Sequence, residues 1–266
     1  MARFHGVLRA VVIGSVLLVA WPAAAAPPSN PAFLGVSMVD VPNGCMVDGV
    51  TPGSGAEAIG LTSGDRVVMV EDASIRTCDE LTAQIIEHAP GDRVRLLIDR
   101  GGRDLTFRAL LSSRAEVLQR RYVGAPVPDF PVTDYDDGQP IDLSRLVGDT
   151  NVLAWFDARH CESCAQVVER IANKTHVTGV TWGEAKELAG GHLATRLGFK
   201  LALFENDKQF DRASMNEHDR IYFMVVDCHG IVRFVLPVVP DADDADAAVD
   251  EVLAAVEQAD HARARR

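Results

Sequence analysis

A pair of cysteines, separated by two residues, follows directly on an apolar run in the second half of the chain. Residues 151–156 (Asn-Val-Leu-Ala-Trp-Phe) are almost entirely apolar, as in a central strand that is covered on both faces. A helical pattern is predicted from Glu162 to Ala172, so that Cys161 and Cys164 lie at its start. Cysteines three residues apart on a helix share one face and are close enough for a disulfide. This half must therefore fold with a helix following a buried strand.

The two cysteines are candidate catalytic residues for thiol–disulfide exchange. The N–H groups at a helix N-terminus favour a thiolate, so we expect Cys161 to be the accessible, attacking sulfur and Cys164 to be the resolving thiol. A protonated His160 would support the thiolate, whereas Glu162 places negative charge beside it. One alternative is a purely structural disulfide.

A metal site is a further alternative for this region. Zinc and copper bind to thiolates and imidazoles, but this half contains only a single Cys-x-x-Cys. We therefore predict no metal site and no cofactor. The soft ligands in question are Cys161, Cys164, Cys228, His160 and His229.

Residues from about Val123 to Ala259 resemble an exported thioredoxin-like protein of the TlpA/ResA type, in the redoxin branch. The resemblance is carried by residues 123–130 (Val-Gly-Ala-Pro-Val-Pro-Asp-Phe), 136–143 and 223–232. It implies an α/β thioredoxin-like fold and a thiol–disulfide oxidoreductase. Ile221 occupies the position of the family's cis-proline, which helps to hold a substrate strand.

Two further positions depart from this family. Trp155 stands where many members carry a buried acid, so a proton relay through that acid is not expected. Ala158 replaces the Ser or Thr that peroxiredoxins require before the reactive cysteine, which argues against peroxidase activity.

Short β segments broken by glycine turns characterise residues 33–111. One helix is predicted from Thr77 to Ala89, because Leu81, Ile85 and His88 recur at helical spacing and Pro90-Gly91 follows. The predicted strands are Phe33–Val41, Cys45–Val50, Arg66–Val70, Val94–Ile98 and Leu105–Leu111.

This first half resembles a bacterial PDZ domain of the kind attached to HtrA-type proteases. Residues 60–67 (Gly-Leu-Thr-Ser-Gly-Asp-Arg-Val), Ile75 and residues 90–94 (Pro-Gly-Asp-Arg-Val) carry the resemblance. It implies a small β-barrel or sandwich with helices, in which residues 33–36 (Phe-Leu-Gly-Val) form a carboxylate-binding loop. The implied peptide-binding residues are Leu34, Gly35, Val36, Leu81 and Ile85.

Proteolysis is not expected, although the family's proteases place this module after a serine protease domain. Gly53-Ser54-Gly55 falls in a loop of the PDZ-like half, with no room for a catalytic domain around it.

The N-terminal residues have the pattern of a secretory signal peptide. Two arginines, an apolar run from Ala10 to Trp21 and the small residues Ala23–Ala26 predict cleavage near Ala25, with an uncleaved anchor as the alternative. The mature protein is then periplasmic or secreted, where disulfides persist. Cys45 and Cys78 could pair there or be two small buried residues.

The net charge of the chain limits the classes of partner that it can bind. The formal net charge is −12, from 26 basic and 38 acidic residues. Such a chain repels phosphate backbones and anionic membrane surfaces, so nucleic acid is excluded as a partner.

These patterns predict a two-domain protein. The boundaries are residues 1–25 for the signal peptide, 31–112 for the PDZ-like domain, 113–123 for a linker with few core-forming residues, and 124–260 for the thioredoxin-like domain. We expect an exported thiol–disulfide oxidoreductase whose PDZ module recruits exported proteins or C-terminal peptides, with a membrane thiol carrier as electron donor. The alternative is a non-catalytic periplasmic scaffold with a degenerate thioredoxin-like domain.

Overall fold

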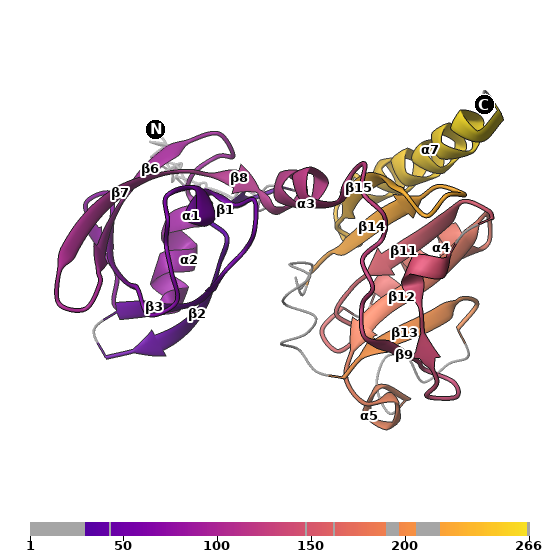
Figure 1. The fold of residues 1–266 in the computed structure, drawn as a ribbon, viewed down its shortest axis with the longest axis horizontal. Helices are drawn as coiled ribbons and strands as arrows, with labels where there is room; N and C mark the ends of the chain where they lie inside the picture. The colour runs from indigo at the N-terminus through magenta and orange to yellow at the C-terminus, as the bar shows by residue number, and fades with distance from the viewer. Residues whose placement is uncertain are drawn as a thin grey trace, which may run out of the picture.

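The computed structural model describes residues 30–42, 44–146, 148–161, 163–189, 197–205 and 219–264. The predicted signal peptide lies outside these residues. Two folded halves are joined by a short helix, α3 (Figure 1). Within the described part of the chain, no helix is long and apolar enough to cross a membrane.

The first half is built on a six-stranded antiparallel sheet whose two ends do not meet. Its main order is β2 (Val36–Val41), β3 (Gly44–Val50), β4 (Arg66–Val70), β6 (Arg93–Asp99) and β7 (Asp104–Leu110), and β5 (Ala73–Ser74) pairs with β4. A separate two-stranded ribbon joins β1 (Ala32–Phe33) to β8 (Ser112–Ser113). The predicted barrel is therefore wrong, because the free edge of β2 faces a helix instead of pairing with β7.

That helix is α2 (Cys78–Ile86), which packs against β1, β2, β3 and β4. Thr77 is its N-cap, and the Thr77 Oγ1 accepts a hydrogen bond of 3.2 Å from the N–H of Glu80. Leu81 and Ile85, which the helical spacing predicts to face inward, are buried. A single turn, α1 (Gly55–Ala58), completes the helices of this half.

The segment between the halves is helix α3 (Arg114–Tyr122), and it belongs to a core. A capping box starts it: the Ser113 Oγ accepts from the N–H of Glu116, and the Ser113 N–H donates to the Glu116 carboxylate. The expectation of few core-forming residues here is wrong. Four of its side chains are buried, namely Ala115, Val117, Leu118 and Tyr122. Ala115, Leu118 and Tyr122 share one face of the helix, and Val117 lies on the opposite face.

The second half contains a seven-stranded mixed sheet. Its order is β10 (Pro140–Ile141), β9 (Val132–Asp134), β13 (Lys200–Phe204), β12 (His176–Trp182), β11 (Asn151–Trp155), β14 (Ile221–Val226) and β15 (Val232–Val238). Strands β11, β12 and β13 are parallel, whereas β14 and β15 are antiparallel to their neighbours. A 3-10 turn (Leu143–Arg145) and the helices α4 (Cys164–Ala172), α5 (Ala185–Ala189) and α7 (Ala245–Ala264) complete it.

Strand β11 is buried on both faces, as its apolar run predicts. Leu153 and Trp155 point into a core cluster that also holds Ala115, Leu118 and Tyr122 of α3. Alternate residues of the same strand point into the cluster on the other face, which contains side chains of α4 and α7. The joining helix is therefore part of the second half's core.

Candidate functional site

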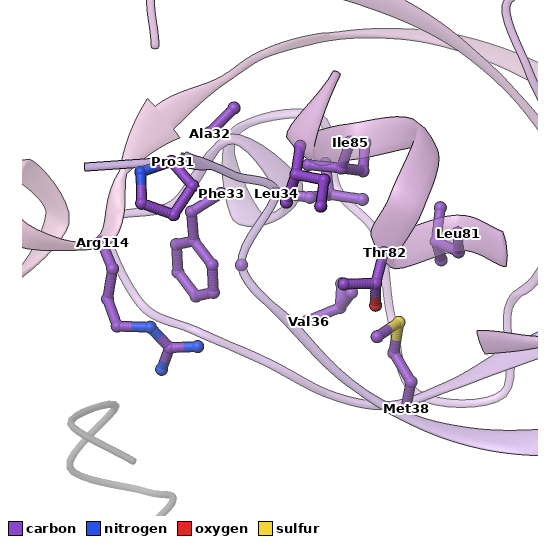
Figure 2. A pocket seen from close by; sticks show the side chains of 12 residues that line it. Pro31, Ala32, Phe33, Leu34, Val36, Met38, Leu81, Thr82, Ile85 and Arg114 are labelled. Atoms are coloured by element: carbon purple, nitrogen blue, oxygen red, sulfur yellow. The ribbon is translucent and has the colours of Figure 1, made fainter. Parts of the chain in front are cut away.

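A groove in the first half lies between the free edge of β2 and helix α2. Figure 2 shows its walls: Val36 and Met38 from the strand, and Leu81, Thr82 and Ile85 from the helix. The groove has a volume of about 160 Å³. An apolar groove beside an unpaired strand edge can bind an extended chain, because the edge offers main-chain hydrogen bonds and the groove takes alternate side chains.

A loop at one end of this groove presents backbone N–H groups. The Leu34 carbonyl accepts a hydrogen bond from the Ala56 N–H (3.0 Å), and the Gly35 carbonyl accepts one from the Thr51 N–H (2.9 Å). In a trans peptide the next N–H points opposite to the carbonyl, so the N–H groups of Gly35 and Val36 point away from residues 51–56. Gly35 and Val36 line the groove and residues 51–56 do not, so we infer that both N–H groups face the groove. Two adjacent N–H groups make a cradle for an anion.

Gly35 is required for this loop geometry. Its φ is +92°, a region that disfavours side chains, and an added Cβ would overlap the Cβ and Oγ of Ser54. The Ser54 hydroxyl also donates to the Gly35 carbonyl at 3.4 Å. The turn therefore depends on the close approach of a residue that is distant in sequence.

The five residues predicted from the resemblance to bind a peptide all line the groove. They are Leu34, Gly35, Val36, Leu81 and Ile85. Several other lining residues were not predicted from the sequence. For Met38, its position two residues after Val36 on one strand face was an available signal. For Arg114 no local pattern gives a signal, because only the tertiary fold brings it to the groove. The missed residues are Pro31, Ala32, Met38, Thr82, Ile86 and Arg114.

One wall of the groove is covalently tied to the sheet. Cys45 of β3 and Cys78, the first residue of α2, form a disulfide with a Cα–Cα distance of 4.7 Å. The Cys78 N–H also donates to the Asp40 carboxylate of β2 at 2.7 Å. The N-terminus of α2 is therefore fixed both to β3 and to the edge strand that forms the opposite wall. Of the two expectations for these cysteines, the structure selects pairing.

The second candidate site is the Cys161–Cys164 disulfide, whose Cα atoms are 5.4 Å apart. Helix α4 begins at Cys164 with Ser163 as its N-cap, so Cys161 lies before the helix and not in its predicted first turn. The predicted exposure of Cys161 is also wrong in this oxidised form, because only 6% of the residue is exposed and Cys164 is wholly buried. The Cys161 N–H donates a hydrogen bond of 3.0 Å to the Asp157 carbonyl. This bond closes a turn that holds Cys161 inward.

A buried carboxylate organises that turn. Asp157 is the second residue after β11 and is wholly buried, and its carboxylate lies 2.8 Å from the Nδ1 of His160, which is exposed. The same carboxylate accepts from the N–H of Arg159 at 3.0 Å. The Arg159 guanidinium stacks on Trp182, 4.1 Å from the ring centroid, and pairs with Glu187 at 2.7 Å. The disulfide is therefore flanked by an aspartate–histidine pair that the sequence alone did not predict.

The other predicted residues fall at two places in this half. Ile221 begins β14 and is buried in the same core cluster as Cys161 and Cys164. Cys228 is a half-buried free thiol whose sulfur lies 3.3 Å from the Nδ1 of His229. The structure does not assemble the alternative metal site: among the described residues, no three His, Cys, Asp or Glu side chains cluster suitably for an ion.

Asp227 orders the turn that carries this free thiol. Burial raises the pKa of Asp227, but hydrogen bonds from the Ile231 and His229 N–H groups and from the Arg233 guanidinium outweigh it, so the net pKa is below its usual value. Arg233 lies 2.6 Å from the carboxylate. The carboxylate thus stays ionised and fixes the backbone on both sides of Gly230, without contributing to the Cys161–Cys164 site.

The comparisons with known proteins concern the first half. Residues 32–111 match the family model described as "PDZ domain". The periplasmic pH-dependent serine endoprotease DegQ of Escherichia coli (strain K12) is 30% identical over 110 residues, which cover 39% of this chain and 24% of that protein. The chain therefore spans about a quarter of the length of this curated relative.

Several solved structures match about a third of this chain. A serine endoprotease from Yersinia pestis is 21% identical with a TM-score of 0.29, covering 32% of this chain and 30% of that one. The HtrA3 PDZ domain bound to a phage-derived ligand is 22% identical with a TM-score of 0.29, covering 31% of this chain and 86% of that one. The groove between an edge strand and a helix, together with the family match, identifies residues 32–111 as a PDZ domain.

Proposed function

We propose that this protein binds the C-terminal segments of other proteins in the groove between β2 and α2. The observation that carries the proposal is the combination of a free strand edge, an apolar groove and two N–H groups at one end. A peptide would add a strand to β2, place its last side chain among Leu34, Leu81 and Ile85, and direct its carboxylate at the loop of residues 33–36. The apolar walls of the groove suit an aliphatic or aromatic last residue.

Strand addition can be tested by hydrogen exchange on the full chain. The probe is the tightest-binding member of a heptapeptide library with free C-termini, added at roughly 100 times its Kd. We expect exchange at the outward-facing amides of β2 to slow by up to about 100-fold. The amides of β7, at the opposite end of the same sheet, should not change and are the internal control. A library without any binding member, or equal protection of both edges, would refute the proposal.

The disulfides of this protein support the proposal that its clients are exported proteins. Two disulfides fit an oxidising environment outside the cytoplasm. A periplasmic location, with the N-terminal residues acting as a signal peptide, is the finer proposal, and the name of the related protein DegQ supports it.

A second function, thiol–disulfide exchange, is favoured by the Cys161–Cys164 disulfide beside Asp157 and His160. We propose a thioredoxin-like second half, supported by the position of this pair between the parallel strand β11 and helix α4 and by the antiparallel strands β14 and β15 beside β11. In the reducing direction, the Cys161 thiolate attacks a client disulfide and one client sulfur leaves as a thiolate that takes up a proton. Cys164 then attacks Cys161, which releases the second client thiol and re-forms the intramolecular disulfide. A membrane thiol carrier would reduce that disulfide again by exchange.

Trapping of mixed disulfides separates exchange from a purely structural disulfide. In a Cys228→Ser background, which removes the free thiol, Cys164→Ser should accumulate mixed disulfides with exported proteins in cells. Cys161→Ser is the matched control and should trap none, because it lacks the attacking sulfur and leaves the wholly buried Cys164. Diagonal gel electrophoresis measures both. Equal, empty traps would identify the second half as a scaffold.

A further inference from the structure

The loop of residues 51–56 supports the turn at Gly35 from the side opposite to the groove. Its Thr51 N–H and its Ser54 hydroxyl both donate to the Gly35 carbonyl, at 2.9 Å and 3.4 Å. Because a trans peptide unit is planar, a carbonyl held on one side keeps the N–H of the next residue on the other. The direction of the N–H groups at the groove therefore depends on where this supporting loop lies.

Helix α3 contacts the supporting loop at Gly53, although α3 lies outside the matched domain. The Arg120 guanidinium donates to the Gly53 carbonyl at 3.2 Å. The same nitrogen donates to the Ser112 hydroxyl at 3.0 Å, and Ser112 pairs with Phe33 in the ribbon of β1 and β8. The wholly buried Val117 lies on the same side, with its Cγ1 4.0 Å from the position that a Cβ on Gly53 would take. This face of α3 therefore holds the supporting loop and the ribbon together.

The opposite face of α3 is buried in the core of the second half. Ala115, Leu118 and Tyr122 belong to the core cluster on one face of β11. The Gln119 side chain also donates to the Val235 carbonyl of β15 at 3.1 Å. The second half therefore fixes the position of α3, and the part of the PDZ domain that α3 contacts lies directly behind the turn at Gly35.

We propose that Arg120 is a positioning residue for peptide binding, so that the second half, through α3, sets the geometry of the N–H groups that receive the peptide's carboxylate. This inference rests on the proposed peptide binding and places a determinant of its affinity outside the matched domain. Arg120 does not line the groove and acts by holding Gly53. A turn that is fixed in advance binds an anion without the cost of being ordered. The contribution of Arg120 is therefore specific to ligands that carry a terminal carboxylate.

The test measures binding of one peptide to the full chain, as the free acid and as the C-terminal amide. The peptides used end in valine, leucine or phenylalanine. We expect Arg120→Met, which keeps the length of the side chain but removes its donors, to weaken binding of the acid by about 3- to 10-fold and of the amide by less than about twofold. Arg120→Lys keeps a donor that can reach the Gly53 carbonyl, so it should lose less than Arg120→Met.

Arg108→Met is the matched control for the loss of charge. Arg108 is exposed on β7, at the opposite end of the sheet from β2, and its replacement changes the net charge equally. This variant should leave the affinities for acid and amide unchanged.

A second pair of variants tests the part played by the second half. Leu118→Ala removes a wholly buried side chain from the face of α3 that packs there, and it should weaken binding of the acid by about 3- to 10-fold. Leu201→Ala is the matched control, because Leu201 of β13 is also buried, but in the cluster on the other face of the sheet, which is formed without α3. Leu201→Ala should destabilise the second half similarly and leave both affinities unchanged.

Comparing acid with amide separates positioning from stability, because an unfolded fraction weakens the binding of both equally. Equal weakening of acid and amide by Arg120→Met, or no weakening of either, would overturn the inference. Equal weakening by Leu118→Ala and Leu201→Ala would show that the second half does not act through α3. If the wild-type chain binds none of the acids, or binds acid and amide alike, the proposed binding of a C-terminal carboxylate fails first.

Discussion

Gly35→Ala is expected to abolish detectable peptide binding. The residue has a φ of +92°, and its Cβ would overlap the side chain of Ser54 so closely that the loop must move. Movement of the loop displaces the N–H groups of Gly35 and Val36, and it breaks the hydrogen bonds that the Leu34 and Gly35 carbonyls accept from Ala56 and Thr51. We expect the free energy of unfolding of this half to fall by about 2–4 kcal/mol. Isothermal titration with a free-acid peptide and urea denaturation measure the two effects.

Gly91→Ala is the matched control for this prediction. Gly91 has nearly the same φ, +97°, but no atom lies within 4 Å of the position that a Cβ would take. Its cost is therefore the backbone strain alone, about 1–2 kcal/mol, and peptide binding should stay within about twofold of wild type. The difference between the two variants isolates the contact with Ser54. Binding by Gly35→Ala at wild-type affinity would contradict the assignment of the loop as the anion cradle.

The turn at Gly35 also shows what the sequence could and could not indicate in the first half. Alternation predicts a strand from Phe33 to Val41, but the structure divides it into β1 and β2. The division arises because residues 34 and 35 bond to the loop of residues 51–56, a contact between distant segments that no local pattern contains. The helix and its inward residues Leu81 and Ile85 were predictable, because they depend only on spacing and on the turn after them.

Helix α3 was predictable in part. Its polar composition suggests a linker, yet Ala115, Leu118 and Tyr122 recur at i, i+3 and i+7, which is the spacing of a helix with one buried face. That face packs on β15 and on the core around Trp155, so the burial comes from the second half. Arg114 was not predictable, since its place in the groove depends on how both halves hold this helix.

The cysteine pair illustrates a different limit. The spacing correctly predicts that Cys161 and Cys164 can pair after a buried strand, but it places Cys161 in the first helical turn and in solvent. The structure begins α4 only at Cys164, because the Asp157 carbonyl accepts the N–H groups of His160 and Cys161 and forms a separate tight turn. The sequence did offer one signal for this turn, a carboxylate immediately after an apolar run. That this carboxylate is buried is visible only in the packed fold.

Removing the Cys45–Cys78 disulfide is expected to lower the free energy of unfolding of the PDZ half by about 3–4 kcal/mol. The bridge joins residues separated by 33 positions, so in the chain-entropy description it restricts a long loop in the unfolded state. Cys45 is also wholly buried, and replacement by alanine leaves a small void. Urea denaturation of Cys45→Ala/Cys78→Ala, followed by hydrogen exchange at β3 and α2, measures the loss in this half.

Cys228→Ala is the control, because it removes a half-buried cysteine without removing a bridge and should change stability by less than about 1 kcal/mol. The stability of the PDZ half in wild type should fall on adding dithiothreitol, whereas that of the double variant should not respond. A loss of less than about 1 kcal/mol in the double variant would mean that the unfolded chain is not restricted by this loop.

The same double variant should bind a free-acid peptide several-fold more weakly than wild type does. The disulfide and the hydrogen bond from the Cys78 N–H to Asp40 both hold the first turn of α2 against the sheet, and without the disulfide one constraint on that wall remains. If helix α2 is free to move, it must become ordered when the peptide binds. This ordering lowers the affinity and is not offset by any new contact with the peptide. Unchanged affinity together with the expected loss of stability would show that Asp40 and the packing of Leu81 and Ile85 alone keep the groove in its binding geometry.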